Sequence, residues 1–167
     1  MSDHAAGLRL KTRCDDLHGF QRHLAAGERA DLILCMGDTL THLESMEFVV
    51  ALGRAVAGRL APGGRFVATF RDYSRLPAGA ARFIPWADED RILTCFLEEF
   101  EGYVQVHDIL HERASGTWAM RAGSYRKLRL AAEVAREAFA GAGLRTTVEA
   151  GPRGMLRLVA DGDAGRR

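Results

Sequence analysis

The clearest pattern in the chain is a short apolar run that ends in a glycine and an acidic residue. Leu32–Met36 is apolar without interruption, and Gly37 and Asp38 follow directly. Five apolar residues are too few for a typical helix, so the run predicts a strand covered on both faces. Apolar positions then recur every three or four residues, which predicts a helix with one buried face. These positions are Met46, Val49, Gly53, Val56 and Leu60.

A turn and a second strand complete this unit. Ala61–Gly64 contains a proline and two glycines, which stop a helix, and Arg65–Phe70 is a second apolar strand. Strand, helix and strand in this order predict a right-handed crossover between parallel strands. Both strands then end at the same edge of the sheet, with Gly37–Thr39 after the first and Arg71–Tyr73 after the second. Ligands of open α/β sheets bind at this carboxyl edge.

The segments on either side of the unit have weaker patterns. Leu8–Arg13 alternates apolar and basic residues and predicts a short strand. A short helix follows, which Asp16 is placed to cap. Residues 74–90 hold two prolines and a glycine and predict an irregular lid or crossover.

The second half of the chain predicts an antiparallel meander followed by a helix and a hairpin. Residues 91–130 form alternating segments separated by turns, and the last segment is expected to break at Gly123. The alanine-rich segment 131–142 predicts a helix. Two further strands, over 144–148 and 155–160, predict a closing hairpin.

Composition narrows the class of protein. The 167 residues suffice for a single domain over 1–167, and the 47% hydrophobic content is ordinary for a globular protein. A net charge of +1 with dispersed basic residues argues against a nucleic-acid groove or an anionic membrane surface as partner. Cys14, Cys35 and Cys95 are far apart and odd in number, which predicts reduced thiols and a cytoplasmic location. No signal peptide or membrane-spanning run is visible.

Three runs carry a family resemblance. Cys35–Leu43 reads CMGDTLTHL, Leu60–Gly64 reads LAPGG, and Phe70–Tyr73 reads FRDY. At this spacing they resemble class I S-adenosylmethionine (SAM)-dependent methyltransferases, nearest to the glycine and sarcosine N-methyltransferases. The resemblance implies an α/β fold: a partial Rossmann-like sheet with strands equivalent to the family's third through seventh and an inserted antiparallel meander over about 91–130. It implies SAM as cofactor and methyl transfer to a small-molecule nucleophile, for which an amine is the first expectation.

One departure from the family pattern outweighs the others. The glycine-rich loop that follows the family's first strand, and the acidic ribose ligand that follows its second, have no counterpart here. A missing N-terminal half, or a second copy of the chain, is therefore expected to complete the domain. The alternative is a non-catalytic remnant or partner subunit that binds no cofactor. A doubly wound dehydrogenase is a third reading, but its fingerprint glycines are equally missing.

The resemblance also assigns cofactor-binding residues. Met36, Gly37 and Asp38 correspond to positions that line the methionine and sulfonium end of SAM, and His42 lies one turn further on. Asp15 or Asp16 corresponds to the position that contacts the adenine. Each has an alternative role: a tight turn after a strand for Gly37 and Asp38, a structural histidine, and a helix cap for one of the two aspartates.

Arg71, Tyr73 and Asp38 are the candidate substrate residues. The matching arginine of the relatives holds a substrate carboxylate as a bidentate fork, and Tyr73 stands beside it. The relatives carry a neutral asparagine at position 38, and an aspartate disfavours a bound carboxylate. An amine or other cationic substrate, or an Arg71 pair with Asp38 or Asp72, fits better. No metal site is expected, because His107 and His111 lie on a half-exposed strand face.

Two structural expectations follow. The open edge of the strand Leu32–Met36 is expected to be covered, by Leu8–Arg13 or by another chain, because a bare apolar edge is a pairing hazard. The Arg71 guanidinium is expected to point into the cleft between Gly37–Asp38 and Tyr73 if it serves a ligand.

Overall fold

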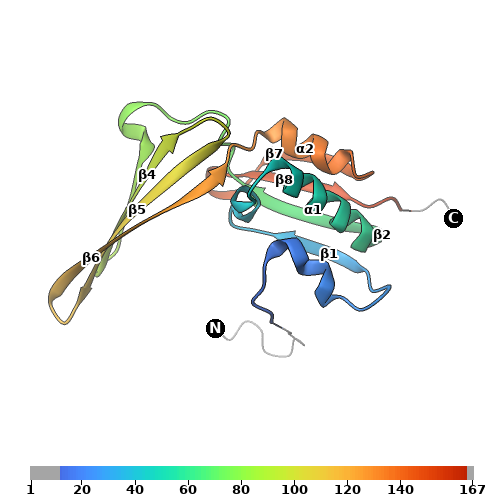
Figure 1. The fold of residues 1–167 in the computed structure, drawn as a ribbon, viewed down its shortest axis with the longest axis horizontal. Helices are drawn as coiled ribbons and strands as arrows, with labels where there is room; N and C mark the ends of the chain where they lie inside the picture. The colour runs from blue at the N-terminus through green and yellow to red at the C-terminus, as the bar shows by residue number, and fades with distance from the viewer. Residues whose placement is uncertain (1–11, 165–167) are drawn as a thin grey trace.

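The computed structural model of the chain describes residues 12–164, which form two four-stranded sheets joined at one end (Figure 1). Sheet A has the strand order β1-β2-β8-β7, and sheet B has the order β3-β4-β5-β6. The strands of sheet A are β1 (Ala30–Cys35), β2 (Leu60–Phe70), β7 (Arg145–Ala150) and β8 (Leu156–Asp161). Those of sheet B are β3 (Phe83–Ala87), β4 (Arg91–Glu99), β5 (Tyr103–Ala114) and β6 (Thr117–Leu128).

Sheet A confirms the predicted α/β unit. β1 and β2 are parallel, and helix α1 (Met46–Arg59) connects them. β2 already begins at Leu60, so Leu60 and the predicted turn at Ala61–Gly64 belong to the strand. β8 is antiparallel to both β2 and β7, so the predicted closing hairpin is also present. Helix α2 (Ala132–Ala140) packs beside α1, and a Cβ at Gly53 would lie 3.2 Å from the Ala138 carbonyl oxygen. Glycine at this position allows the two helices to approach closely.

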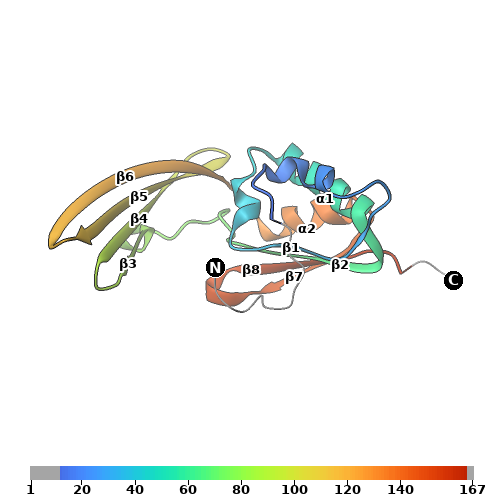
Figure 2. The ribbon, with the colours of Figure 1, turned by 90° about the horizontal axis from the view of Figure 1, so that it is seen from below.

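The helices cover one face of sheet A (Figure 2). Phe66 on β2 and Phe139 on α2 are fully buried, and their rings stack with centroids 4.9 Å apart. A short 3-10 helix, η2 (Leu17–His23), lies on the same side beside α1. The main hydrophobic core of the protein therefore lies between these helices and sheet A.

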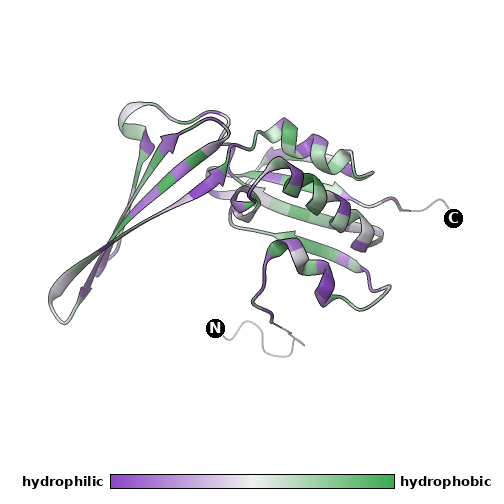
Figure 3. Cartoon of the chain, in the orientation of Figure 1, coloured by the Kyte–Doolittle hydropathy of each residue, from purple (hydrophilic) through white to green (hydrophobic). Residues whose placement is uncertain are grey.

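The prediction that the first strand is covered on both faces is wrong. Leu32 and Leu34 are 55% and 58% exposed, whereas Cys35, which points toward the helices, is buried. β1 is also the edge strand of sheet A, and among residues 12–164 it pairs with β2 alone. Figure 3 shows a largely hydrophobic β1 at this edge. Leu8–Arg13, which was expected to cover the edge, lies mostly outside the described residues, and Thr12 and Arg13 are not in a strand.

Sheet B confirms the antiparallel meander and corrects two details. Residues 74–90 contain the strand β3, where the sequence predicted only irregular structure. β6 runs without interruption through Gly123, which pairs with Asp108, so the predicted break is wrong. β5 supplies a partner residue for every position of β6, and this continuous ladder holds the glycine in the strand.

Candidate functional site

The candidate site begins at the turn that follows β1. Gly37 and Asp38 both have positive φ angles, 77° and 70°. Glycine adopts this conformation without strain, and aspartate tolerates it better than most residues. The Gly37 N–H donates to the Thr69 hydroxyl at 2.9 Å, and the Asp38 N–H donates to the Thr69 carbonyl at 2.9 Å. These bonds fasten the end of β1 to the end of β2, so the turn is fixed at the carboxyl edge of sheet A.

The Asp38 carboxylate is buried and accepts hydrogen bonds from four groups. Its Oδ1 accepts from the Arg71 backbone N–H at 2.8 Å and from the Thr41 hydroxyl at 3.0 Å. Its Oδ2 accepts from the Tyr73 hydroxyl at 2.9 Å and forms an ion pair with Lys127 Nζ. The side chains of Asp38 and Lys127 are only 7% and 9% exposed. Asp38 thus joins segments from both sheets at one point.

The internal ion pair anticipated for Asp38 exists, but its partner is Lys127 and not Arg71. Lys127 lies on β6, 89 residues away in sequence, and no local pattern marks it as a site residue. The alternation of β6 does place Lys127 on the same face as Tyr125, and both side chains contact the segment 38–42 that follows β1. Asp72, the other proposed partner of Arg71, instead accepts from the Ser74 N–H and hydroxyl.

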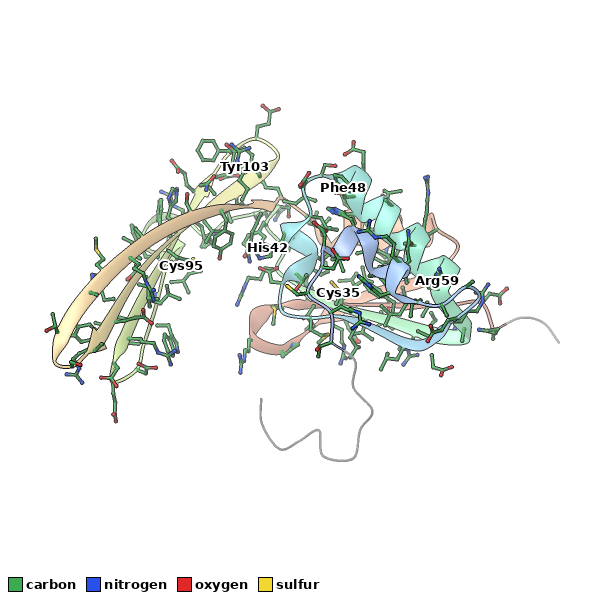
Figure 4. All side chains as sticks on the ribbon, turned by 60° about the horizontal axis from the view of Figure 1, so that its bottom comes forward. Cys35, His42, Phe48, Arg59, Cys95 and Tyr103 are labelled. Atoms are coloured by element: carbon green, nitrogen blue, oxygen red, sulfur yellow. The ribbon has the colours of Figure 1, made fainter. Side chains whose placement is uncertain are left out.

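Two tyrosines and a histidine surround the ion pair. The Lys127 ammonium lies 5.5 Å from the centroid of the Tyr73 ring and 5.9 Å from that of Tyr125. The ring of His42, at the end of the 3-10 helix η3 (Thr39–His42), stacks on Tyr125 with centroids 5.4 Å apart. Figure 4 shows His42 between sheet B and α1. The four side chains come from three separate segments of the chain.

Burial and neighbouring charges shift the titration of these groups. Burial, the nearby Asp38 carboxylate and the hydrogen bond to it all raise the pKa of Tyr73 above its ordinary value. Burial and the Lys127 ammonium lower the pKa of His42, against a smaller opposite effect of Asp38. The phenol of Tyr73 therefore stays protonated and the imidazole of His42 stays neutral at pH 7.

Two cavities adjoin the cluster. The larger, an open cleft of about 740 Å³, lies between the segment around His42 and the inner end of sheet B. It is lined by His42–Glu47, Glu101–Tyr103 and Arg126–Leu128. The smaller, of about 250 Å³, is lined by Arg71–Tyr73, Arg75–Pro77, Ile84, Leu97, Gly154 and Leu156.

Arg71 lines the smaller cavity. A Cβ at Gly154 would lie 3.9 Å from Arg71 Nη1, so the guanidinium lies beside the connection between β7 and β8, not between Asp38 and Tyr73 as expected. Tyr73 borders this cavity as well. Within residues 12–164 the Arg71 guanidinium has no ion-pair partner at 4.0 Å or less. A role for Arg71 in holding a carboxylate remains a prediction.

The remaining candidate residues lie further from the cluster. Met36 is 47% exposed at the end of β1. Asp16 caps η2 by accepting from the His18 N–H at 2.9 Å, and Asp15 Oδ2 lies 2.7 Å from His23 Nε2. The cap confirms the structural role that the sequence offered for one of the two aspartates. Contact of either with adenine stays a prediction.

Several other properties of the described residues bear on function. Cys14, Cys35 and Cys95 form no disulfide. The part of the chain that the structure describes holds no group of three or more metal-ligating side chains. None of its helices is long and apolar enough to cross a membrane.

Comparison with known proteins shows that the described residues share their fold with part of several solved SAM-dependent methyltransferases. No protein-family model and no curated protein sequence matches the chain, but solved structures do. A SAM-dependent methyltransferase from Clostridium acetobutylicum superposes with a TM-score of 0.75 at 13% identity over 95% of this chain. A SAM-bound amino pentose methyltransferase from Micromonospora echinaspora gives 0.71 at 19% over 84%, and a sugar N-methyltransferase from a Streptoalloteichus species gives 0.67 at 15% over 89%.

The matches cover only part of these proteins. The chain spans 67% of the Clostridium protein and 61% of each of the other two. At such low identities the likeness concerns the fold, and no residue role is carried over from it.

Proposed function

We propose that this chain contributes the substrate side of a SAM-dependent methyltransferase that acts on an amine of a small molecule. The observation that carries the proposal is the buried cluster of Asp38, Tyr73 and Lys127 at the carboxyl edge of a methyltransferase sheet, with a cavity on each side. The description of two structural neighbours as amino pentose and sugar N-methyltransferases supports an amine. The closer kinship with glycine and sarcosine N-methyltransferases rests on the sequence runs alone.

The turn at Gly37 fits the methionine end of SAM. Nothing lies within 4 Å of a Cβ built at Gly37, so the backbone there is open to close approach by a ligand. SAM supplies a methyl group already activated on a sulfonium, so the protein has mainly to align the reactants. Met36 and His42 flank the turn and would contact the same end. The residues that would hold the ribose are not among those of this chain.

The substrate side can hold an amine in its reactive form. An amine must lose its proton before it attacks a methyl carbon, and the neutral imidazole of His42 on the larger cleft can accept that proton. Arg71, whose guanidinium has no ion-pair partner within residues 12–164, can bind an acidic group of the substrate. Because Lys127 neutralises Asp38, the objection to a carboxylate near Asp38 no longer applies.

Calorimetry with SAM tests the proposal. For residues 1–167 alone we expect a dissociation constant for SAM of about millimolar or weaker, a binding free energy near −4 kcal/mol. The reason is that the chain offers residues for the adenine and the methionine end of SAM but none for the ribose between them. A fusion of the chain to the N-terminal strand–helix–strand–helix half of a structural neighbour should bind at about micromolar, near −8 kcal/mol. The same fusion with its glycine-rich loop disrupted is the control.

The possible outcomes separate the alternatives. Micromolar binding by the chain alone would refute the need for an N-terminal half. A folded fusion that binds SAM but methylates no amine would remove the proposed substrate class. A folded fusion that fails to bind SAM would favour a non-catalytic partner subunit.

A further inference from the structure

Lys127 is an unusual residue in this chain. Of the 23 lysines and arginines, only residues 11 and 127 are lysines. The buried position in the cluster is therefore filled by the rarer of the two basic residues. Lysine ends in a compact ammonium with three donors, whereas arginine ends in a wide planar fork. The site thus holds the residue that fits a small, enclosed space.

The surroundings of Lys127 explain this preference. Its ammonium lies against the Asp38 carboxylate and near the rings of Tyr73 and Tyr125, and its side chain is 9% exposed. A buried ammonium without a counter-charge is strongly unfavourable, and so is a buried carboxylate. Each of the two charges is tolerated only because the other is present.

We propose that Lys127 is the positioning residue of the candidate site. Its ammonium fixes the Asp38 carboxylate, and Asp38 in turn holds the Tyr73 hydroxyl and the Arg71 N–H. One ion pair therefore sets the end of β1, the end of β2 and the inner end of β6 relative to one another. That these groups face a substrate rests on the proposed function, but their dependence on Lys127 does not.

A double-mutant cycle on the full chain tests the dependence. Lys127→Met leaves Asp38 charged and unpaired, and Asp38→Asn does the same to Lys127. Each single change should lower the folding equilibrium constant about a hundredfold or more, whereas the double variant should recover to within about tenfold of the native chain.

The matched control is an exposed ion pair between β6, which carries Lys127, and the neighbouring strand β5. Arg121 and Glu112 have side chains that are 70% and 38% exposed. Arg121→Met and Glu112→Gln should each change the folding constant less than about fivefold. If Lys127→Met costs no more than Arg121→Met, the proposal is wrong.

Nuclear magnetic resonance supplies a readout that a purely structural lysine would not move. In folded Lys127→Met the ammonium no longer fixes the Asp38 carboxylate, so the hydrogen bond from the Arg71 N–H to Asp38 should weaken and the Arg71 amide proton resonance should shift upfield, while Arg121→Met leaves it in place. An unshifted Arg71 amide would overturn the positioning role even if the cycle shows coupling.

A second spectroscopic measurement covers the case in which the single variants do not fold. In the native chain labelled with ¹⁵N-lysine, Lys11→Arg assigns the signal of Lys127. Its Nζ protons should exchange with water at least tenfold more slowly than those of free lysine. Exchange at the free-lysine rate would also refute the proposal. No step of these tests involves methyl transfer, so their failure is distinct from that of the proposed function.

Discussion

Sheet A and sheet B are stabilised in different ways. Sheet A shares a continuous core with α1 and α2, in which Phe66, Phe70 and Phe139 are fully buried. The second core, at the inner end of sheet B, consists of Leu97, Val104 and Val106 together with Tyr73, which follows β2 of sheet A. Sheet B therefore completes its core with a residue from the segment that follows β2 of sheet A. The difference indicates that sheet A can persist without sheet B, but not the reverse.

The largest expected effect comes from the core of sheet A. Phe139→Ala removes a buried ring that stacks on Phe66 and should cost about 3–5 kcal/mol of the free energy of unfolding. Both sheets should lose hydrogen-exchange protection together, because sheet B depends on sheet A. If the amides of sheet B kept their protection, sheet B would not depend on sheet A for its stability.

A substitution in the second core should affect sheet B and leave sheet A largely unchanged. Leu97→Ala removes a buried side chain of β4 and should cost about 2–5 kcal/mol at that site. Amides of β4–β6 should then exchange faster, while those of β1 and β2 keep their protection. Equal loss in both sheets would indicate one cooperative unit.

Removing the hydrogen bond from the Tyr73 hydroxyl to Asp38 should lower the free energy of unfolding by a smaller amount. Tyr73→Phe keeps the ring and removes the donor to a charged acceptor, at a cost of about 1.5–3 kcal/mol. Since the folded chain raises the pKa of Tyr73 above its ordinary value of about 10, the phenol's contribution is complete below pH 10 and is lost as the pH rises further.

Urea unfolding between pH 8 and 11 measures both consequences. The native chain should lose stability above about pH 10, and Tyr73→Phe should reduce that loss. An identical alkaline decline in both proteins would show that Tyr73 is not the group responsible. Tyr103→Phe provides the comparison, since Tyr103 begins β5 and its ring stacks on Phe100.

The smallest effect is expected on the bare face of β1. Leu32→Ser and Leu34→Ser alter exposed side chains and should change the stability of the chain by less than about 0.5 kcal/mol. They should, however, reduce self-association measured by light scattering, because an exposed apolar face on an edge strand promotes pairing. A large loss of stability would mean that another part of the chain covers this face.

The parts of the fold that local sequence determines could be predicted. The apolar run before Gly37, the helical face from Met46 and the stop before Arg65 led to β1, α1 and β2, because each depends on neighbouring residues. β3 was missed because Pro85 argues against a strand, although it is tolerated here since β3 is an edge strand. The burial of β1 depends on which other elements pack against sheet A, and the residues of β1 itself do not determine this.

The sequence predicted the part of the candidate site that sheet A supplies, but not the part that sheet B supplies. Gly37, Asp38 and Tyr73 follow strands of the central unit, so the crossover rule places them together. Lys127 lies on a strand 89 residues from Asp38 in sequence. The two residues meet only because sheet B packs against the end of sheet A. A single sequence contains no local signal for that arrangement.

The attachment of sheet B at one end has a mechanical consequence. Arg129 donates to the Tyr73 and Ser74 carbonyls beside the Lys127 pair, whereas the turn at Ser115–Gly116 lies at the opposite end of the long β5–β6 ribbon (Figure 1). The ribbon is thus attached near Lys127 and Arg129 and extends away from that attachment. A small rotation of the ribbon about its attached end would therefore displace the turn at Ser115–Gly116 much further than the residues near Lys127.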